Sequence, residues 1–465
     1  MATVSKSNQY NLTKGPIMKT MALYGIPILV AQLIMYLYNL ADTMIIGQKL
    51  GDTYMGAVGA SGTTSGILFS LVGGMTAGFA VIIGIAFGSG DREKTRKSVL
   101  SAELLSLLFG IFITVLGLCL IKPLLRATYF PEDKFEIGQR YLTVIFAGSI
   151  VSAFNNMHTA MLRTLGDSRS PVYILTASAF VNIGLNLLFV NYTNLKEIGV
   201  ALATVISQLV SASIALALFL RHFPEFSFFK KTAWEKGIAV EQVKMGVPMA
   251  FQNSMIMIGA VIVQTAVNQL ETNGKVFNAV ASYVCANSIN NISSTLINTF
   301  GMVIAGYVSQ NYGAKDFNRI KKGIWACLIL SWIISAVLAL LLVLFDRTVV
   351  SWFTDEWSEE LYANVHRFLI INVVFYPIWV PVPILRNAIQ SMKNSLLPFL
   401  SCLVELPMRC ITAWIFSSFW GFDGISLATP TALVAAVVFL LVSFFVIYKK
   451  KKAEIEQSNK IQGNE

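Results

Sequence analysis

Twelve apolar segments, most of them as long as a lipid bilayer is thick, constrain this chain more than any other feature. A membrane-spanning helix needs ~20 mainly apolar residues, and such runs recur here between clusters of glycine, proline and charge. Hydrophobic residues make up 55% of the chain, charged residues 13%, and the mean hydropathy is +0.64, which excludes a soluble globular protein. We expect an all-α integral membrane protein with transmembrane helices at residues 21–47, 54–84, 98–121, 138–161, 171–190, 198–220, 245–269, 278–306, 323–345, 361–385, 395–418 and 425–448.

Lysine and arginine are distributed unequally between alternate loops. With the amino terminus placed in the cytoplasm, the segments on that side hold 25 of the 35 Lys and Arg residues, the opposite side holds nine, and Arg409 lies within a helix. Cytoplasmic loops carry such an excess, so we expect a multi-pass protein of the cell (inner or plasma) membrane with both termini cytoplasmic. This bias and a basic tail near anionic lipid heads explain the net charge of +10, so no nucleic-acid partner is expected.

Residues of catalytic or metal-binding type form no motif. The five cysteines have no CxxC spacing, and His158, His222 and His366 have no second ligand at metal-binding spacing. The chain contains no phosphate-binding GxxxxGK(S/T) loop, no HExxH and no nucleophile elbow, so neither ATP hydrolysis nor another enzymatic activity is expected. We also expect no metal, no cofactor and no removable signal peptide.

The second half of the chain repeats the first at a nearly constant shift. Four segments align at shifts of 221 to 225 residues: YGIPILVAQ with MGVPMAFQN, FGSGDREKTRK with YGAKDFNRIKK, AMLRTLGDSRSP with PILRNAIQSMKN, and GVALATV with GISLATP. Each half has six helices, an even number, so the halves are parallel repeats. The expected organisation is a cytoplasmic segment (1–20), an amino lobe (21–221), a cytoplasmic linker (222–244), a carboxyl lobe (245–448) and the basic tail (449–465).

These features together resemble the multidrug and toxic compound extrusion (MATE) transporters, nearest their DinF-like branch, in the multidrug/oligosaccharidyl-lipid/polysaccharide exporter superfamily. The resemblance spans about Met21 to Tyr448, and it rests on the early Gly-x-Pro, the carboxylate in NLADTMIIGQKLG, the glycine-rich end of helix 2 and LRTLGDSRSP before helix 5. It implies two pseudo-symmetric six-helix bundles in a V around a central cavity. It also implies export of organic, often cationic or amphiphilic, compounds by alternating access, in antiport with H⁺ or Na⁺.

Asp42 is a charged residue in an apolar segment. A charge in hydrocarbon costs about 2.5–3.5 kcal/mol, so it usually has a partner or a function. Asn182 and Asn186, four residues apart on one helical face, and Thr204 on the next helix offer oxygen atoms suited to a proton or small cation. The resemblance places the family's amino-lobe cation site at Asp42, Asn182 and Thr204, whereas many members carry a second aspartate in place of Asn186. Asp42 is therefore either an ion-coupling residue or only a hydrogen-bond acceptor.

A charged pair is expected in the second half. Glu405 and Arg409 align through the repeat with Asn182 and Asn186, and their spacing of four allows an ion pair on one helix. Such a pair could serve assembly alone or take part in coupling or gating. The second-lobe carboxylates of NorM-like members have no counterpart here, so a second cation site of that type is not expected.

A polar stripe and several prolines indicate the transport path. Asn287, Asn291, Ser294 and Asn298 recur at spacings of four, three and four, so this stripe should face protein or water. With adaptable side chains that suit varied amphiphilic substrates, the expected substrate cavity comprises Met35, Tyr36, Gln252, Met255, Met257, Asn287, Asn291, Ser294 and Asn298. Kinks that could act as hinges are expected at Pro27, Pro377, Pro381 and Pro383.

Two other functions fit the sequence less well. A lipid-linked precursor flippase of the same superfamily would line its cavity with several cations for pyrophosphate, whereas Arg409 is the only basic residue deep in an expected helix. A membrane-embedded enzyme or receptor would cluster acids, bases or nucleophiles in one layer. We expect a monomer in the bilayer that binds small organic molecules and transports H⁺ or Na⁺ as its coupling ion.

Overall fold

The described part of the chain is built from helices. The computed structural model describes residues 11–127, 130, 132–227, 233–272, 279–351 and 358–462. The long helices are α1 (Ile17–Leu50), α2 (Asp52–Gly88), α3 (Arg92–Ala127), α6 (Ser170–Tyr192), α7 (Lys196–His222), α8 (Lys236–Thr272), α9 (Ala279–Gly313), α10 (Phe317–Ser351) and α16 (Ala428–Gln462). Shorter helices are η2 (Glu132–Lys134), α4 (Phe135–Ala147), α5 (Ser149–Thr164), η3 (Pro224–Phe226), α11 (Glu359–Val374), α12 (Tyr376–Trp379), α13 (Pro381–Ser391), α14 (Leu396–Ile411), the π-helical η4 (Thr412–Phe416) and α15 (Ser417–Ser426).

The helices match the expected membrane spans. Ten spans of the described residues are long and apolar enough to cross a membrane, and the number rises to twelve if each of two bent pairs is one span. One bent pair is α4 with α5, which meet at 50°, and the other is α11 with α12 and α13, which meet at 48°. The twelve expected segments correspond to these twelve spans, so the all-α membrane architecture is confirmed.

Several helices extend well beyond the apolar runs that revealed them. α8 begins at Lys236, nine residues before the expected start, and α16 continues through the basic tail to Gln462. Charged residues such as Lys and Glu are good helix formers, so a helix does not end where its hydrophobic run ends. Lys451 pairs with Glu454 at 2.9 Å and Lys452 with Glu456 at 3.6 Å, which places helical i,i+3 and i,i+4 pairs along this tail.

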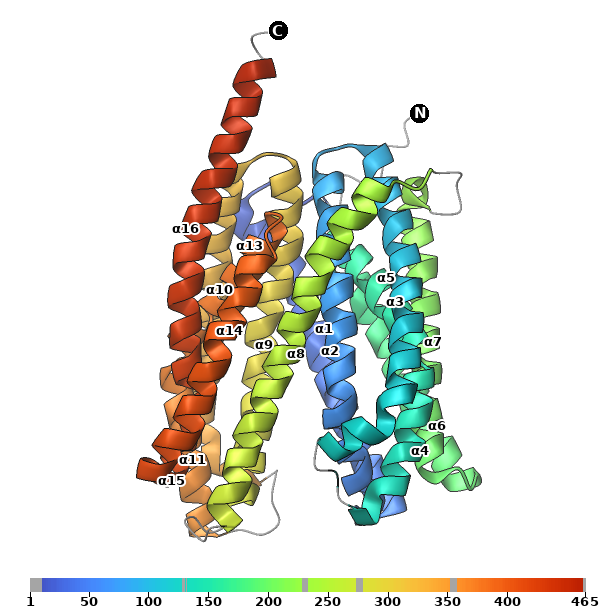
Figure 1. The fold of residues 1–465 in the computed structure, drawn as a ribbon, viewed down its shortest axis with the longest axis vertical. Coiled ribbons are helices and arrows are strands. Elements are labelled where there is room, and N and C mark those ends of the chain that lie inside the picture. The colour runs from blue at the N-terminus through green and yellow to red at the C-terminus, as the bar shows by residue number, and fades with distance from the viewer. Residues whose placement is uncertain are drawn as a thin grey trace. The chain divides into compact units, whose positions relative to one another are not determined.

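The structure consists of two compact units. Unit 1 comprises Met1–Gly15, Leu23–Ser254 and Ser309–Ala314, and unit 2 comprises Pro16–Ala22, Met255–Val308 and Lys315–Glu465. The division falls inside α8, since the half of this helix before Met255 belongs to unit 1. Within unit 1, α3 packs against α2 and α5, and α5 packs against α7 (Figure 1).

The internal repeat is visible in the turns as well as in the helices. Asp91 accepts a hydrogen bond from the Lys94 amide at 2.9 Å at the start of α3, and Asp316, 225 residues later, accepts one from the Arg319 amide at 2.8 Å. The residues before these aspartates, Gly90 and Lys315, have φ values of 78° and 59°. The two turns are therefore helix caps of the same design, as expected for a repeated loop rather than a phosphate-binding loop.

Lipid-facing and inward-facing residues separate cleanly on α3. Leu104 and Leu108 are 41% and 63% exposed, whereas Glu103, Ser106 and Gly110 are buried. A soluble protein shows the reverse arrangement, and a broad exposed apolar face of this kind fits contact with lipid chains. The polar groups of unit 1 are consequently gathered in its interior, where they can act on one another.

Two glycine pairs let helices of unit 1 approach closely. A Cβ atom on Gly78 of α2 would lie 2.4 Å from the Cα atom of Gly246 in α8. A Cβ atom on Gly88 would lie 1.9 Å from the Gln310 carbonyl oxygen, and one on Gly313 would lie 2.0 Å from that of Ile85. Only glycine permits such backbone contact, which is common where membrane helices cross.

Candidate functional site

Asp42 lies inside unit 1, far along α1. At 1.5 Å per residue it is about 38 Å from Ile17 along the helix axis. Its carboxylate accepts a hydrogen bond from the amide nitrogen of Asn186 in α6. The same nitrogen donates to the Asn182 side-chain oxygen at 2.7 Å, and both asparagines are fully buried. Three of the four residues expected at this site are therefore in one hydrogen-bonded group.

Thr204, the fourth expected residue, takes part less directly. Its hydroxyl donates to the Val200 carbonyl of its own helix at 3.1 Å. Tyr38, one helical turn before Asp42, has its hydroxyl within hydrogen-bonding reach of the Thr204 and Ser207 side chains. The group thus includes Tyr38 and Ser207, which sequence reasoning missed, although the spacing of four between Tyr38 and Asp42 placed both on one face of α1.

One acceptor in this group has no protein partner. The side-chain oxygen of Asn186 is buried and forms no hydrogen bond with the described residues. It belongs to the same amide group whose nitrogen donates hydrogen bonds to Asp42 and Asn182. A half-buried carboxylate beside an unused amide oxygen is suited to a proton or to part of a small cation's coordination.

A second charged group lies in unit 2. Glu405 and Arg409 pair at 2.6 Å, so the expected contact is present, while its role stays a prediction. Arg386 also contacts this carboxylate, at 2.9 Å. The exposed fractions of Arg386, Glu405 and Arg409 are 7%, 5% and 7%. The result is a buried triad of two cations and one anion rather than a pair.

The expected helix 361–385 ended one residue before Arg386, and this boundary was wrong. Arg386 lies within α13, which begins at Pro381 because proline suits the first turn of a helix. Gly259 of α8 makes room for the other cation, since a Cβ atom there would lie 2.7 Å from the Nη1 atom of Arg409. The Nε atoms of both arginines have no hydrogen-bond partner among the described residues.

The residues expected to line a substrate cavity fall in both units. Met35, Tyr36 and Gln252 belong to unit 1, and the other six belong to unit 2. On α9, Asn291 and Asn298 are exposed and Asn287 and Ser294 are partly exposed, with Asn298 donating to Ser294 at 3.1 Å. This polar stripe is at least partly accessible, as expected of a face in contact with water.

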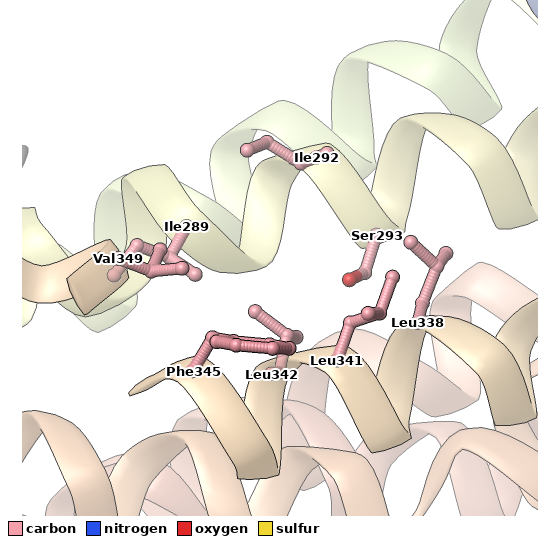
Figure 2. Close-up of a pocket in the computed structure, with 8 residues that line it drawn as sticks. All are labelled: Ile289, Ile292, Ser293, Leu338, Leu341, Leu342, Phe345 and Val349. Atoms are coloured by element: carbon pink, nitrogen blue, oxygen red, sulfur yellow. The ribbon is translucent and has the colours of Figure 1, made fainter. Parts of the chain in front are cut away.

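A pocket of about 220 Å³ lies between α9 and α10 of unit 2 (Figure 2). Its lining is Ile289, Ile292, Ser293, Leu338, Leu341, Leu342, Phe345 and Val349. Ser293 supplies its one hydroxyl, which faces the space between the two helices (Figure 2). None of the expected cavity residues lines this pocket, and it offers little polarity for orienting a substrate.

The expected bend in the segment 361–385 is present. The span breaks at Phe375, where α11 ends and α12 begins, with Pro377 in α12 and with Pro381 and Pro383 at the start of α13. α1 instead continues as one helix through Pro27. The hinge function of these prolines stays a prediction.

Every histidine of the chain lies beside a carboxylate. His158 is 2.9 Å from Glu103, His222 is 2.7 Å from Asp167, and His366 contacts Asp346. None of these pairs has a third ligand of metal-binding type, since the described residues contain no cluster of three or more such side chains.

Comparison with known proteins agrees with this architecture. The model of the MatE family matches residues 27–188 and 248–415. The chain is 25% identical over 460 residues to "Probable multidrug resistance protein YoeA" of Bacillus subtilis, covering 95% of this chain and 96% of that protein. It is 22% identical over 437 residues to the "FAD transporter" of Shewanella oneidensis, covering 91% and 93%.

A solved structure shares the fold over nearly the whole chain. "Crystal structure of MATE in complex with MaL6" superimposes with a TM-score of 0.87 at 20% identity, covering 97% of this chain and 100% of the other. The family model matches well over half of the sequence and falls once in each repeat. This chain therefore belongs to the MatE family.

Proposed function

We infer that this protein is a secondary active multidrug exporter that exchanges organic compounds for H⁺ or Na⁺ by alternating access. Two findings support export. The chain belongs to the MatE family, and a relative that matches it over 95% of its length is named a probable multidrug resistance protein. The observation that carries ion coupling is the hydrogen-bonded group of the half-buried Asp42 with the buried Asn186 and Asn182, because it joins a titratable side chain to partners inside the protein. The protein acts as a transporter and not as an enzyme.

Coupling follows from what one proton does to this group. The ionised Asp42 carboxylate can only accept hydrogen bonds, and it accepts one from the Asn186 nitrogen. A protonated Asp42 carboxyl gains a donor, for which the unused Asn186 oxygen is the available acceptor. Rotation of the Asn186 amide would break its bond to Asn182, so proton binding changes the contact between α1 and α6. A coupling ion needs only such a difference in affinity between two conformations.

The orientation of the protein is part of the proposal. The excess of 25 over nine Lys and Arg residues favours a cell-membrane protein with both termini in the cytoplasm. The start of α3 then lies at the cytoplasmic side and Asp42 in the outer half of the membrane. The protein works as a monomer with small organic substrates, and H⁺ or Na⁺ is transported rather than retained as a cofactor.

Transport by purified protein in proteoliposomes tests the function. Ethidium accumulation is measured with a pH gradient alone, a Na⁺ gradient alone, both, or neither. We expect accumulation with at least one gradient and none without, and the effective gradient identifies the coupling ion. Failure of both gradients to drive any of several cationic dyes would contradict the proposal.

The charge preference for substrates has its own test. Two buried arginines share one glutamate in unit 2, and one relative is named an FAD transporter. The substrate panel therefore includes FAD, an anionic dinucleotide, beside ethidium. Transport of FAD and not ethidium would retain gradient-driven export while reversing the expected substrate charge.

A further inference from the structure

A second buried titratable pair lies in unit 1, away from Asp42. Glu103 of α3 and His158 of α5 place Oε1 and Nε2 2.9 Å apart. Their exposed fractions are 7% and 4%, and the His158 ring stacks on Phe154 with centroids 5.9 Å apart. Glu103 is about 17 Å along α3 from Arg92, beside the exposed Leu104. The pair therefore lies inside the expected apolar segments 98–121 and 138–161, near the ends that should face the cytoplasm, and an ionisable group within such a segment usually has a function.

Both side chains of the pair have buried hydrogen-bonding atoms that are not used. The two ring nitrogens of His158 and the Oε1 atom of Glu103 form no aligned hydrogen bond with any described residue. The two side chains are nevertheless within contact distance. No rigid network therefore fixes the proton on one partner. A carboxyl group and an imidazole in contact offer two atoms, Oε1 and Nε2, on which one proton can reside.

Buried polar side chains lead from Asp42 toward this pair. Asp42 is bound by Asn186, which is bound to Asn182 at 2.7 Å. Asn182 in turn donates to the Ser207 hydroxyl of α7 at 3.5 Å. These hydrogen bonds connect polar side chains of α1, α6 and α7. Each partner is a hydroxyl or amide that changes its donor and acceptor roles by rotation.

The polar run continues from α7 to α5. Gln208, the residue after Ser207, accepts a hydrogen bond from the Ser152 hydroxyl of α5. One turn further along α7, Ser211 donates to the Asn155 side chain at 2.6 Å. Asn155 precedes His158 by three residues, so both lie on one side of α5. Ser207, Ser211 and Ser152 are all buried.

We propose that Glu103 and His158 form a second proton-binding site of unit 1 whose occupancy is coupled to that of Asp42 through these polar side chains of α6, α7 and α5. The ligand is H⁺ alone: one proton binds or leaves, and no electron moves. Protonation of Asp42 turns Asn186. Hydrogen bonds join Asp42 to Ser207 and Ser211 to Asn155, while the steps from Ser207 to Ser211 and from Asn155 to His158 follow one turn of α7 and of α5, so the change at Asn186 acts on His158 through these two helices. The inference rests on the proposed ion coupling at Asp42.

Few other charges act on the pair. α2 contains no Asp, Glu, Lys, Arg or His between Thr53 and Gly88. Lys97 of α3 is engaged by Glu93 and Glu235 at 2.9 and 3.3 Å. The remaining titratable or charged groups near the same ends of α3, α5, α7, η3 and α8 are Arg92, Lys94, Arg96, Arg163, Arg221, His222 with its partner Asp167, Glu225, Lys236, Glu241 and Lys244. Among the described residues none of them forms an ion pair with Glu103 or His158.

Imidazole nitrogen NMR of the full-length protein in lipid nanodiscs tests the site itself. The chain has three histidines, so His158→Gln identifies the His158 signals. We expect His158 to titrate, and Glu103→Gln to weaken its proton binding about tenfold, because an adjacent carboxylate favours the imidazolium. Glu103→Asp, which keeps the charge, should have a smaller effect and serves if Glu103→Gln does not fold. An unchanged His158 titration in both Glu103 variants would overturn the site.

Coupling has a separate measurement with a matched control. Asp42→Asn mimics the protonated carboxyl, and we expect it to shift the His158 titration at least twofold. Adding Ser211→Ala should remove that shift, whereas adding Ser213→Ala should not, since Ser213 is exposed and bonds only the Leu209 carbonyl of its own helix. A His158 titration that ignores Asp42→Asn would overturn the coupling.

Transport data then separate this inference from the proposed function. In proteoliposomes, Glu103→Gln and His158→Gln should reduce gradient-driven ethidium accumulation at least tenfold while leaving ethidium counterflow within twofold of wild type. Loss of both activities together with thermal stability would indicate a structural pair and overturn the inference. Wild-type protein without any gradient-driven transport would contradict the proposed function, while the His158 titration would still decide whether the second site exists.

Discussion

Replacement of Glu405 should be far more damaging than replacement of either arginine beside it. Glu405→Gln leaves Arg386 and Arg409 buried without a counter-charge. Removing one partner of a buried ion pair costs about 3–5 kcal/mol because the other charge stays uncompensated, and here two charges stay. This cost applies to the triad because its contacts are 2.9 and 2.6 Å long and all three residues are almost completely buried.

The arginine variants should be milder for the same reason. Arg386→Gln or Arg409→Gln removes one charge-assisted hydrogen bond, worth about 1.5–3 kcal/mol, and leaves a neutral pair. We therefore expect the loss on Glu405→Gln to be at least twice that of either arginine variant. Combining Glu405→Gln with Arg409→Gln should recover part of the loss, because only one unpaired cation then remains.

The assay is the thermal unfolding midpoint of purified protein in detergent, followed by the helical circular dichroism signal. Lys452→Gln is the control, since Lys452 is 50% exposed in its pair with Glu456 and such pairs contribute at most about 1 kcal/mol. If Glu405→Gln lowered the midpoint no more than Arg386→Gln or Arg409→Gln, the reasoning from net charge would be refuted.

Three further perturbations test other parts of the structure. Asp42→Asn should leave folding and substrate binding intact but abolish gradient-driven accumulation, with Asn182→Ala and Thr204→Ala weaker in the same direction; undiminished export by the purified variant would return Asp42 to a packing role. Gly88→Ala should destabilise the protein by about 1–3 kcal/mol because its Cβ meets backbone, whereas Gly73→Ala, with no atom within 4 Å, should be neutral or stabilising in the same melting assay. In a variant without its five cysteines, single cysteines replacing Glu132 and Lys321 should react from opposite sides of the membrane, and equal labelling from outside would contradict the topology.

The sequence predicted the helices well because the bilayer imposes a simple rule on them. Runs of about 20 apolar residues have few alternatives in a chain of this composition, and all twelve were found. Their ends were missed by up to 14 residues, as in α16, because charged residues prolong a helix without contributing to its apolar run. The bend at Gly148 was also missed, since no proline marks it, although the repeat aligns it closely with the break at Phe375.

The charged interior was only partly predictable. Asp42 and its asparagines were found because one carboxylate in an apolar segment and two amides on one face are visible locally. Glu103 carried the same signal in the segment SVLSAELLSLLF, but its partner His158 is 55 residues away on another helix, and no spacing rule connects them. Arg386 was hidden by its nearness to a loop, because distance along the chain does not show which face of a short helix is buried.

Gly88 and Gly313 occupy equivalent positions of the repeat, and each contacts the backbone beside the other. Such a two-way contact is the pattern found at the interface of a symmetric homodimer. Gly88 meets Gln310, and Gly313 meets Ile85, so each half offers the same surface to the other. Side chains at some equivalent positions differ in charge, as the amide of Asn186 and the guanidinium of Arg409 illustrate. A contact made by backbone atoms leaves no side chain to diverge. Sequence drift after duplication could therefore give the two halves different chemistry while the point at which they cross kept its original symmetry.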